Sequence, residues 1–193
     1  MSIQEILNKA RSEPDLRIRS EILTYALRDD PNREGAELLL RDLGETHRQL
    51  GDLDAALFYL EQAWDKDPSS PDILISLGAV YSAQKEFDQA LQLYSQAYEA
   101  EGRPHILVLM ADTLQNLGRQ KEAEVYVRTA IRLQDDKDAP YAQYVLGKVL
   151  CGLEKYEEAL NAFENAAVAK NLKTVPQWIK FVKERLKAQI ENS

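Results

Sequence analysis

The side chains of this sequence that are best suited to nucleophilic or metal-binding chemistry are two histidines and one cysteine. A cysteine beside a histidine can form an activated nucleophile, and two histidines at positions i and i+4 can bind zinc. His47, His105 and Cys151 lie far apart in the sequence, without ligand spacing. The sequence also has no glycine-rich phosphate loop, GxSxG or HExxH pattern. We therefore predict a protein that is not an enzyme and needs no cofactor or metal.

The net charge and the apolar runs of the sequence indicate which class of partner the protein binds. The net charge of −8 argues against a general affinity for nucleic acid or for an anionic membrane. The longest apolar run, residues 106–111, is far too short to span a membrane. The N-terminal residues lack the basic and apolar regions of a signal peptide. We therefore expect a cytoplasmic protein whose partner is another protein or a peptide, not a nucleic acid or a small-molecule substrate.

The elements that would position any functional side chain recur along the chain. Each unit contains two alanines that flank one bulky residue at helical spacing. Successive units are 34, 33 and 36 residues apart in all three columns. The alanines are Ala56, Ala90, Ala123 and Ala159, followed by Ala63, Ala97, Ala130 and Ala166; the bulky residues are Leu60, Tyr94, Val127 and Phe163. Columns that stay in register over four units indicate a structural repeat.

Glycines upstream of these columns keep the same register. Gly44, Gly78 and Gly147 precede the bulky residue in three of the units, and the third unit has Ala111 instead. A glycine inside a helix costs about 1 kcal/mol relative to alanine. Such a cost is understandable if helix packing requires the missing side chain. We therefore expect the small residues to let helices approach closely, with the bulky residue filling the space above them.

These columns resemble the tetratricopeptide repeat, a helix–turn–helix unit of about 34 residues. The resemblance implies an all-α fold: a right-handed solenoid of antiparallel helix pairs. It predicts a single domain over residues 1–193, with a degenerate helix pair at 1–31 and repeats at 37–70, 71–103, 104–139 and 140–171. A short insertion near residues 32–35 would precede the first repeat. A polar loop at residues 135–138 would account for the longest spacing between repeats.

The C-terminal segment is basic and amphipathic. Apolar residues recur along positions 174–191, and residues 170–193 contain six basic and two acidic side chains. A solenoid needs a terminal element with a polar outer face, so we expect a C-terminal capping helix. A basic amphipathic helix can also bind a membrane surface or a partner, and this alternative stays open.

The same resemblance implies that the first helix of each pair lines the concave side of the solenoid. The spacing of the repeats indicates which positions of each first helix would face this groove. They are Arg41, Arg48, Ile75, Ala79, His105, Val108, Asp112, Tyr141, Tyr144 and Lys148. Tyrosine provides a large contact area at low entropic cost. The two tyrosines could equally pack on neighbouring helices, since periodicity alone does not distinguish one helix face from another.

Some tetratricopeptide proteins bind the C-terminal carboxylate of heat-shock chaperones through basic residues of successive repeats. The matching positions here are Arg41, Glu45, Ser76, His105 and Leu109. Glu45 would repel a carboxylate, so we do not expect this mode of binding. The sequence instead predicts a scaffold, adaptor or assembly factor that binds a peptide or helix in its groove. The alternatives are a secretion-type chaperone for an apolar client segment and a structural module that assembles with itself as a homo-oligomer.

Overall fold

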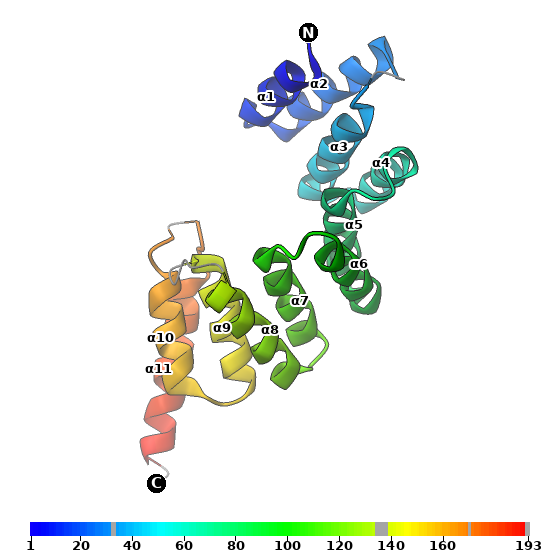
Figure 1. Ribbon diagram of the computed structural model, residues 1–193. Helices are drawn as coiled ribbons and strands as arrows, with labels where there is room; N and C mark the ends of the chain where they lie inside the picture. Colours follow the sequence, from blue (N-terminus) through cyan, green and yellow to red (C-terminus); the bar gives the residue numbers. More distant parts are fainter. Residues whose placement is uncertain (32–33, 134–138, 170, 192–193) are drawn as a thin grey trace. The chain divides into compact units, whose positions relative to one another are not determined.

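The regular structure of the described residues is helical. The structure is a computed structural model that describes residues 1–31, 34–133, 139–169 and 171–191. Within these residues the regular elements are eleven helices, and there is no strand (Figure 1). Their bounds are α1 Ile3–Ser12, α2 Leu16–Asp29, α3 Ala36–Leu50, α4 Leu53–Lys66, α5 Pro71–Ala83, α6 Phe87–Glu101, α7 Pro104–Asn116, α8 Gln120–Leu133, α9 Pro140–Gly152, α10 Tyr156–Ala166 and α11 Val175–Glu191. The predicted all-α fold of paired helices is confirmed.

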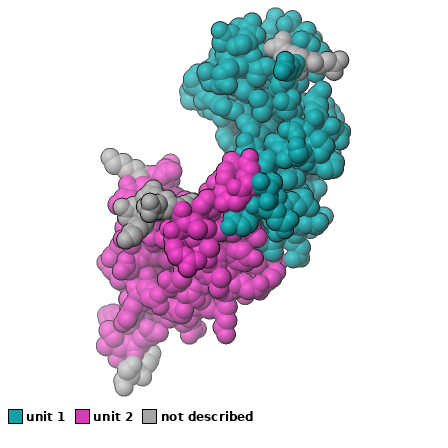
Figure 2. Space-filling model, viewed as in Figure 1, with its two compact units in different colours: residues 1–100 teal, residues 101–193 magenta. Residues whose placement is uncertain are grey.

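The chain divides into two compact units (Figure 2). Residues 1–100 form the first unit, which contains α1 to α5 and almost all of α6. Residues 101–193 form the second unit, which contains α7 to α11. The prediction of one continuous domain over residues 1–193 stays a prediction. The expected insertion includes Asn32 and Arg33, which lie outside the described residues, as do the expected loop at 135–138 and Lys170.

Helix boundaries follow local sequence signals. Asp15 precedes α2, and its side chain accepts hydrogen bonds from the first-turn amides of Arg17 and Ile18. A proline occupies the first position of α5, α7 and α9, where its missing N–H costs nothing because that group has no partner within the helix. These signals define where the first helix of each later pair begins.

The turn inside each repeat contains one residue with a left-handed backbone. In two repeats this residue is a glycine, Gly51 (φ 82°) or Gly118 (φ 76°). In the other two, Lys85 (φ 65°) and Glu154 (φ 59°) have the same conformation. A side chain makes this conformation costly, which is why glycine is the usual choice. The repeat therefore imposes its turn geometry even where the local sequence opposes it.

The alanine columns form the interior of the helix pairs. All eight alanines have an exposed fraction of 0%. The expected glycine contacts are also present: a Cβ added at Gly44 would lie 2.5 Å from Cγ of Leu60, and one added at Gly78 would lie 2.6 Å from Cε1 of Tyr94. Real Cβ atoms do not approach carbon so closely, so a larger residue would displace the facing side chain. In the three repeats that have a glycine at this position, the bulky residue of the second helix thus packs directly on the first helix.

In the third repeat, different residues occupy the space between the two helices. It has Ala111 where the other repeats have glycine, and Val127 where they have leucine or an aromatic residue. Both side chains have an exposed fraction of 0%. A larger residue on the first helix is therefore accompanied by a smaller one on the second, which conserves the volume between the helices.

Both ends of the chain are packed against the repeats. The pair α1–α2 contributes Leu7 and Leu23 to a core that also contains Leu39 and Leu43 of α3. At the other end α11 packs on α10, where the ring of Trp178 stacks on that of Phe163 with centroids 5.5 Å apart. The predicted C-terminal capping helix is thereby confirmed.

Candidate functional site

Three polar and aromatic side chains on one face of α9 form a cluster with one carboxylate of α7; we call it the α9 cluster, and its members are Asp112, Tyr141, Tyr144 and Lys148. The three α9 residues lie three or four positions apart, so they share one side of the helix. Lys148 donates a hydrogen bond of 2.7 Å from Nζ to Oδ1 of Asp112 on α7. The Tyr141 hydroxyl donates to Oδ2 of the same carboxylate at 3.4 Å. Asp112 therefore links the first helices of two successive repeats.

The two tyrosines of the cluster differ in their surroundings. Tyr141 is 42% exposed. Tyr144 is half-buried: its ring centroid lies 6.1 Å from that of Phe163, and its hydroxyl accepts a hydrogen bond of 3.2 Å from Oγ1 of Thr174. Lys148 Nζ lies 5.7 Å from the centroid of the Tyr144 ring, within the range of a cation–π interaction. Tyr141 thus offers the open aromatic surface of the cluster, and Tyr144 supports it.

The predicted site residues of the first unit are arginines held by carboxylates. Arg41 of α3 forms ion pairs with Asp42 at 2.9 Å and with Asp72 of α5 at 3.1 Å. Arg48 donates two hydrogen bonds to Glu45, at 2.6 and 2.8 Å. These bonds raise the pKa of Arg48. Burial raises the pKa of Glu45, but the hydrogen bonds from Arg48 and Gln49 outweigh it, so that pKa is lowered. Both arginines are therefore already neutralised within the unit.

The other predicted positions differ in accessibility. Ile75 and Ala79 of α5 are half-buried, and His105 is exposed at the start of α7. Val108 is only 2% exposed, which places its side chain in the interior of the protein. Buried residues occupy most of the circumference of α7. Val108 can therefore be covered although His105, three residues earlier, is exposed. The structure thus brings Asp112, Tyr141, Tyr144 and Lys148 into contact with one another, and it keeps Arg41 and Arg48 in separate ion pairs.

The histidine and the cysteine that are suited to catalysis are packed within the fold. The His47 ring packs on Tyr59 with centroids 5.3 Å apart, and its Nε2 lies 3.2 Å from Oγ of Ser20. Cys151 is half-buried, and burial raises the pKa of its thiol to about 11. Among the residues that the structure describes, no three acidic, histidine or cysteine side chains form a group that could hold a metal ion. None of the described helices has the length and apolarity needed to cross a bilayer.

Several residues that contact the site residues could not be predicted by counting positions along the repeat. They include Asp72, which pairs with Arg41, and Thr174, which binds Tyr144. A signal does exist in the spacing. Three of these contacts join residues 29 to 31 positions apart: Arg41–Asp72, Tyr141–Asp112 and Tyr144–Thr174. This separation is shorter than the repeat length by about one helical turn, whereas Lys148 and Asp112 are 36 positions apart.

The sequence matches two family models, each described as a tetratricopeptide repeat. One match covers residues 47–102 and the other covers residues 108–172. Together they span more than half of the chain. No curated protein has a sequence that matches this chain.

Similar folds occur in solved structures. A thermophilic TPR protein of Thermus thermophilus has a TM-score of 0.76 and 18% identity, and the match covers 96% of this chain and 99% of that protein. A tetratricopeptide repeat protein of Parabacteroides merdae has a TM-score of 0.72 and 18% identity, with 95% and 73% covered. MamA has a TM-score of 0.66 and 19% identity, with 90% and 98% covered. At such identities the likeness concerns the fold.

Proposed function

Because this chain belongs to the tetratricopeptide repeat family, whose members generally mediate protein–protein interactions, we propose that it is an adaptor or assembly factor that binds a peptide or helix of a partner through α7 and α9. Repeats of this kind are typically non-catalytic interaction scaffolds. The proposal places the contact surface on the α9 cluster.

One observation carries the proposal: a partly exposed tyrosine lies beside a paired lysine and carboxylate, and its hydroxyl donates a hydrogen bond of 3.4 Å to that carboxylate. Asp112 receives hydrogen bonds from Tyr141 and Lys148, so these three side chains restrict one another. A restricted aromatic side chain loses little entropy when a partner covers it. Tyrosine is also among the residues that most often dominate binding energy. Tyr141 is therefore the proposed anchor, and Asp112 is a positioning residue for it.

The partner that fits this surface is a protein segment with an apolar side chain to cover the Tyr141 ring and polar groups for its hydroxyl and for Lys148. The remaining predicted contact positions, Arg41, Arg48, Ile75, Ala79 and His105, stay predictions. A secretion-type chaperone would use the same surface for a longer apolar client segment. The two roles differ in the client, because a chaperone would bind many apolar segments with similar affinity and an adaptor would discriminate among them.

The experiment starts from peptides selected by phage display against the full-length chain. Their affinity is then measured by calorimetry for the wild type, for Tyr141→Ala and for Phe58→Ala. Phe58 of α4 is 60% exposed and serves as a matched aromatic control outside the α9 cluster. We expect Tyr141→Ala to weaken binding roughly tenfold or more, which is the loss typical of an anchor residue. Phe58→Ala should leave the affinity unchanged.

Salt concentration separates apolar from ionic binding. Contacts anchored by an aromatic ring should persist at about 0.5 M salt, whereas contacts between exposed charges are screened there. Equal affinities for the wild type and Tyr141→Ala, combined with loss of binding at high salt, would contradict the proposal.

A further inference from the structure

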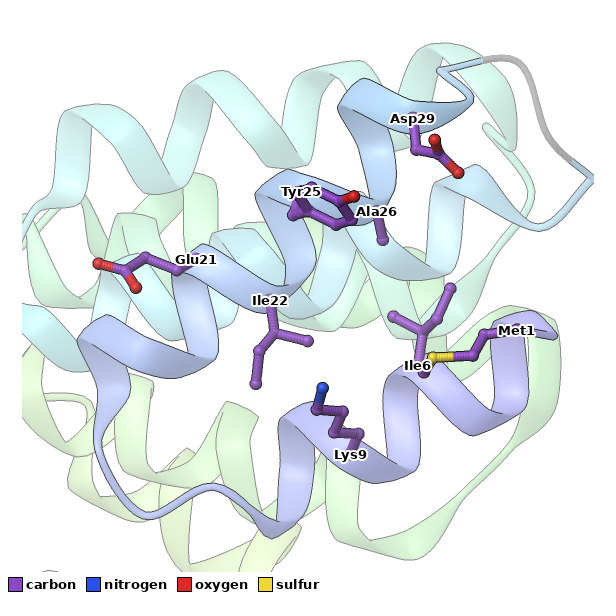
Figure 3. A pocket seen from close by; sticks show the side chains of 8 residues that line it. All are labelled: Met1, Ile6, Lys9, Glu21, Ile22, Tyr25, Ala26 and Asp29. Carbon is purple, nitrogen blue, oxygen red and sulfur yellow. The ribbon is translucent and has the colours of Figure 1, made fainter.

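An apolar pocket lies between α1 and α2 in the first unit. It encloses about 480 Å³. Ile6 of α1 and Ile22 of α2 point into it from opposite sides, and Tyr25 lies along one edge (Figure 3). Tyr25 is 75% exposed, and Ile18, one helical turn before Ile22, is 45% exposed. The outer side of α2 therefore carries an apolar stripe of Ile18, Ile22 and Tyr25, whose members lie three or four positions apart.

This stripe makes α2 apolar on two sides. Leu23 and Ala26 of the same helix are buried in the core that α1, α2 and α3 share. A surface helix of a globular protein usually has a single apolar stripe, which faces the core, with polar residues on the opposite side. A second, exposed stripe that is bordered by polar side chains is typical of a surface that contacts another molecule.

Charged side chains of both signs border the stripe. Lys9 of α1 and Glu21 of α2 line the pocket, and Ile22 lies between them (Figure 3). Among the described residues, no carboxylate pairs with Lys9 and no basic side chain pairs with Glu21. Asp29, the other carboxylate of the pocket, already interacts within the chain. We call the surface formed by Lys9, Ile18, Glu21, Ile22 and Tyr25 the α1–α2 face.

A second copy of the chain carries the charges that would pair with Lys9 and Glu21. In a contact with two-fold symmetry, each residue pair occurs twice, with the two roles exchanged. An axis between Lys9 and Glu21 would bring each of them to the oppositely charged residue of the other copy and would place Ile22 near the centre. We propose that two copies pair through their α1–α2 faces, with Ile22 and Tyr25 covered and two Lys9–Glu21 ion pairs at the rim.

The charge of the N-terminal residues favours a second copy over a strongly charged partner. Residues 1–31 carry five basic and six acidic side chains, a net charge of −1. Two such segments repel each other little, and reciprocal ion pairs fix the orientation in which they meet. A face with both signs of charge is complementary to itself, whereas a uniformly basic or acidic partner would satisfy only one of the two residues.

The two-fold contact has a definite stoichiometry. Each copy uses its α1–α2 face in the contact, so association stops at a dimer. A face made of a few side chains on two helices buries a small area, and small interfaces are weak and transient. We therefore expect a weak dimer whose population rises with protein concentration. The α1–α2 face shares no residue with the α9 cluster, so this proposal and the proposed function can fail independently.

Sedimentation velocity from about 10 μM to about 1 mM covers the range of weak affinities. The average mass of the wild type should rise with concentration towards that of a dimer and not beyond it. Tyr25→Lys should lower the association constant about tenfold or more, as expected for an aromatic anchor. Because Tyr25 is mostly exposed, the melting temperature should not change. Val125→Lys is the matched control: Val125 is 65% exposed on α8, so this variant should dimerise as the wild type does.

Charge reversal tests the two ion pairs. Lys9→Glu and Glu21→Lys each replace two attractive contacts of the dimer by two repulsive ones, so each should lower the association constant about tenfold. An equimolar mixture of the two variants should form a 1:1 heterodimer as readily as the wild type dimerises, because both pairs again join opposite charges. Lys121→Glu, at an exposed position of α8, is the control and should dimerise normally.

Three results would each overturn the proposal. They are a wild type that stays monomeric up to about 1 mM, an assembly that grows beyond a dimer, and a mixture of Lys9→Glu and Glu21→Lys that associates no better than either variant alone. Melting temperatures separate loss of the contact from loss of the fold. Both side chains are exposed, so each variant should melt close to the wild type.

Discussion

Phe163 of α10 lies so close to Gly147 of α9 that no Cβ fits between them. A Cβ added at Gly147 would be 2.7 Å from Cε1 of Phe163, and two further ring carbons would lie 2.8 Å away. The ring cannot easily retreat, because it has an exposed fraction of 0% and stacks on Trp178 from α11. This contact joins α9, α10 and α11. It fixes the position of α9, the helix that carries three of the four side chains of the α9 cluster.

Gly147→Ala should therefore destabilise the protein. Alanine improves helix propensity by about 1 kcal/mol, but forcing a methyl group into a packed interior costs about 1–3 kcal/mol. We expect a net loss of free energy of unfolding of about 1 kcal/mol, measured by chemical denaturation followed by circular dichroism. Gly152→Ala at the end of the same helix is the control, because its Cβ would meet only the side chain of Gln120, which can move aside.

A second substitution tests whether Phe163 is the cause. Phe163→Val removes the ring and, together with Gly147→Ala, gives the fourth repeat the combination found at Ala111 and Val127 of the third. Phe163→Val should cost less in the Gly147→Ala background than in the wild type. The coupling energy should be at least about 0.5 kcal/mol, as is usual for residues in contact. Additive effects of the two substitutions would refute the direct contact.

Lys85 offers a substitution that should stabilise the protein. Its backbone has a φ of 65°, in the left-handed region, where a residue with a side chain is disfavoured by about 1 kcal/mol relative to glycine. Lys85→Gly should raise the melting temperature. Lys180→Gly, inside α11, should lower it, because glycine reduces helix propensity by about 1 kcal/mol. Thermal denaturation of both variants compares one lysine-to-glycine change in two backbone conformations, and a decrease for Lys85→Gly would contradict the account.

The two tryptophans of the chain should differ in their effect on stability. Trp178 of α11 stacks on Phe163, with centroids 5.5 Å apart and an angle of 17° between the rings. Trp64 of α4 is 43% exposed. Trp178→Ala should lower the free energy of unfolding by about 3 kcal/mol, in the range for a packed aromatic residue, and Trp64→Ala by much less. Equal losses in denaturation experiments would mean that α11 does not cap α10 as described.

The thiol of Cys151 should react slowly. Burial raises its pKa to about 11, so at pH 8 nearly all of it is the protonated thiol, and the thiolate is the reactive form. Labelling with a disulfide reagent at pH 8 should be far slower for the native chain than for the chain unfolded in denaturant. The native rate should increase towards pH 11 as the thiolate forms. A native rate equal to the unfolded rate at pH 8 would contradict this burial.

The sequence predicts the fold well because the packing of each repeat depends on few residue types. Buried alanines and glycines such as Ala90 and Gly147 are recognisable from their fixed spacing, and each reports a close helix contact. The capping helix follows from the amphipathic stripe that comes after the last repeat. The turn at Lys85 is different, because nothing in its residue type indicates a left-handed backbone. It becomes visible only through its alignment with Gly51 and Gly118.

The candidate site is less predictable from the sequence because contacts between repeats depend on side-chain reach as well as on register. Counting along the repeat places Tyr141 and Lys148 on one face, and the structure adds that Asp112 binds both. The same counting places Val108 on that surface, although its side chain is buried. The pocket between α1 and α2, which is lined by Ile6, Ile22 and Tyr25 among others, does not follow from the sequence, because the degenerate pair carries no repeat signature that would indicate its outer face.

Photo-crosslinking from position 141 measures the central claim most directly. A benzophenone amino acid is introduced at Tyr141 and, separately, at Phe58 in the full-length chain, and each is irradiated with the peptide selected by phage display. Both side chains are exposed, at 42% and 60%, so the probe at position 58 is at least as accessible as the probe at position 141. The account predicts crosslinks from position 141 that unlabelled peptide suppresses, and few from position 58. Equal crosslinking from both positions, or crosslinking from position 58 alone, would contradict a binding surface on α7 and α9.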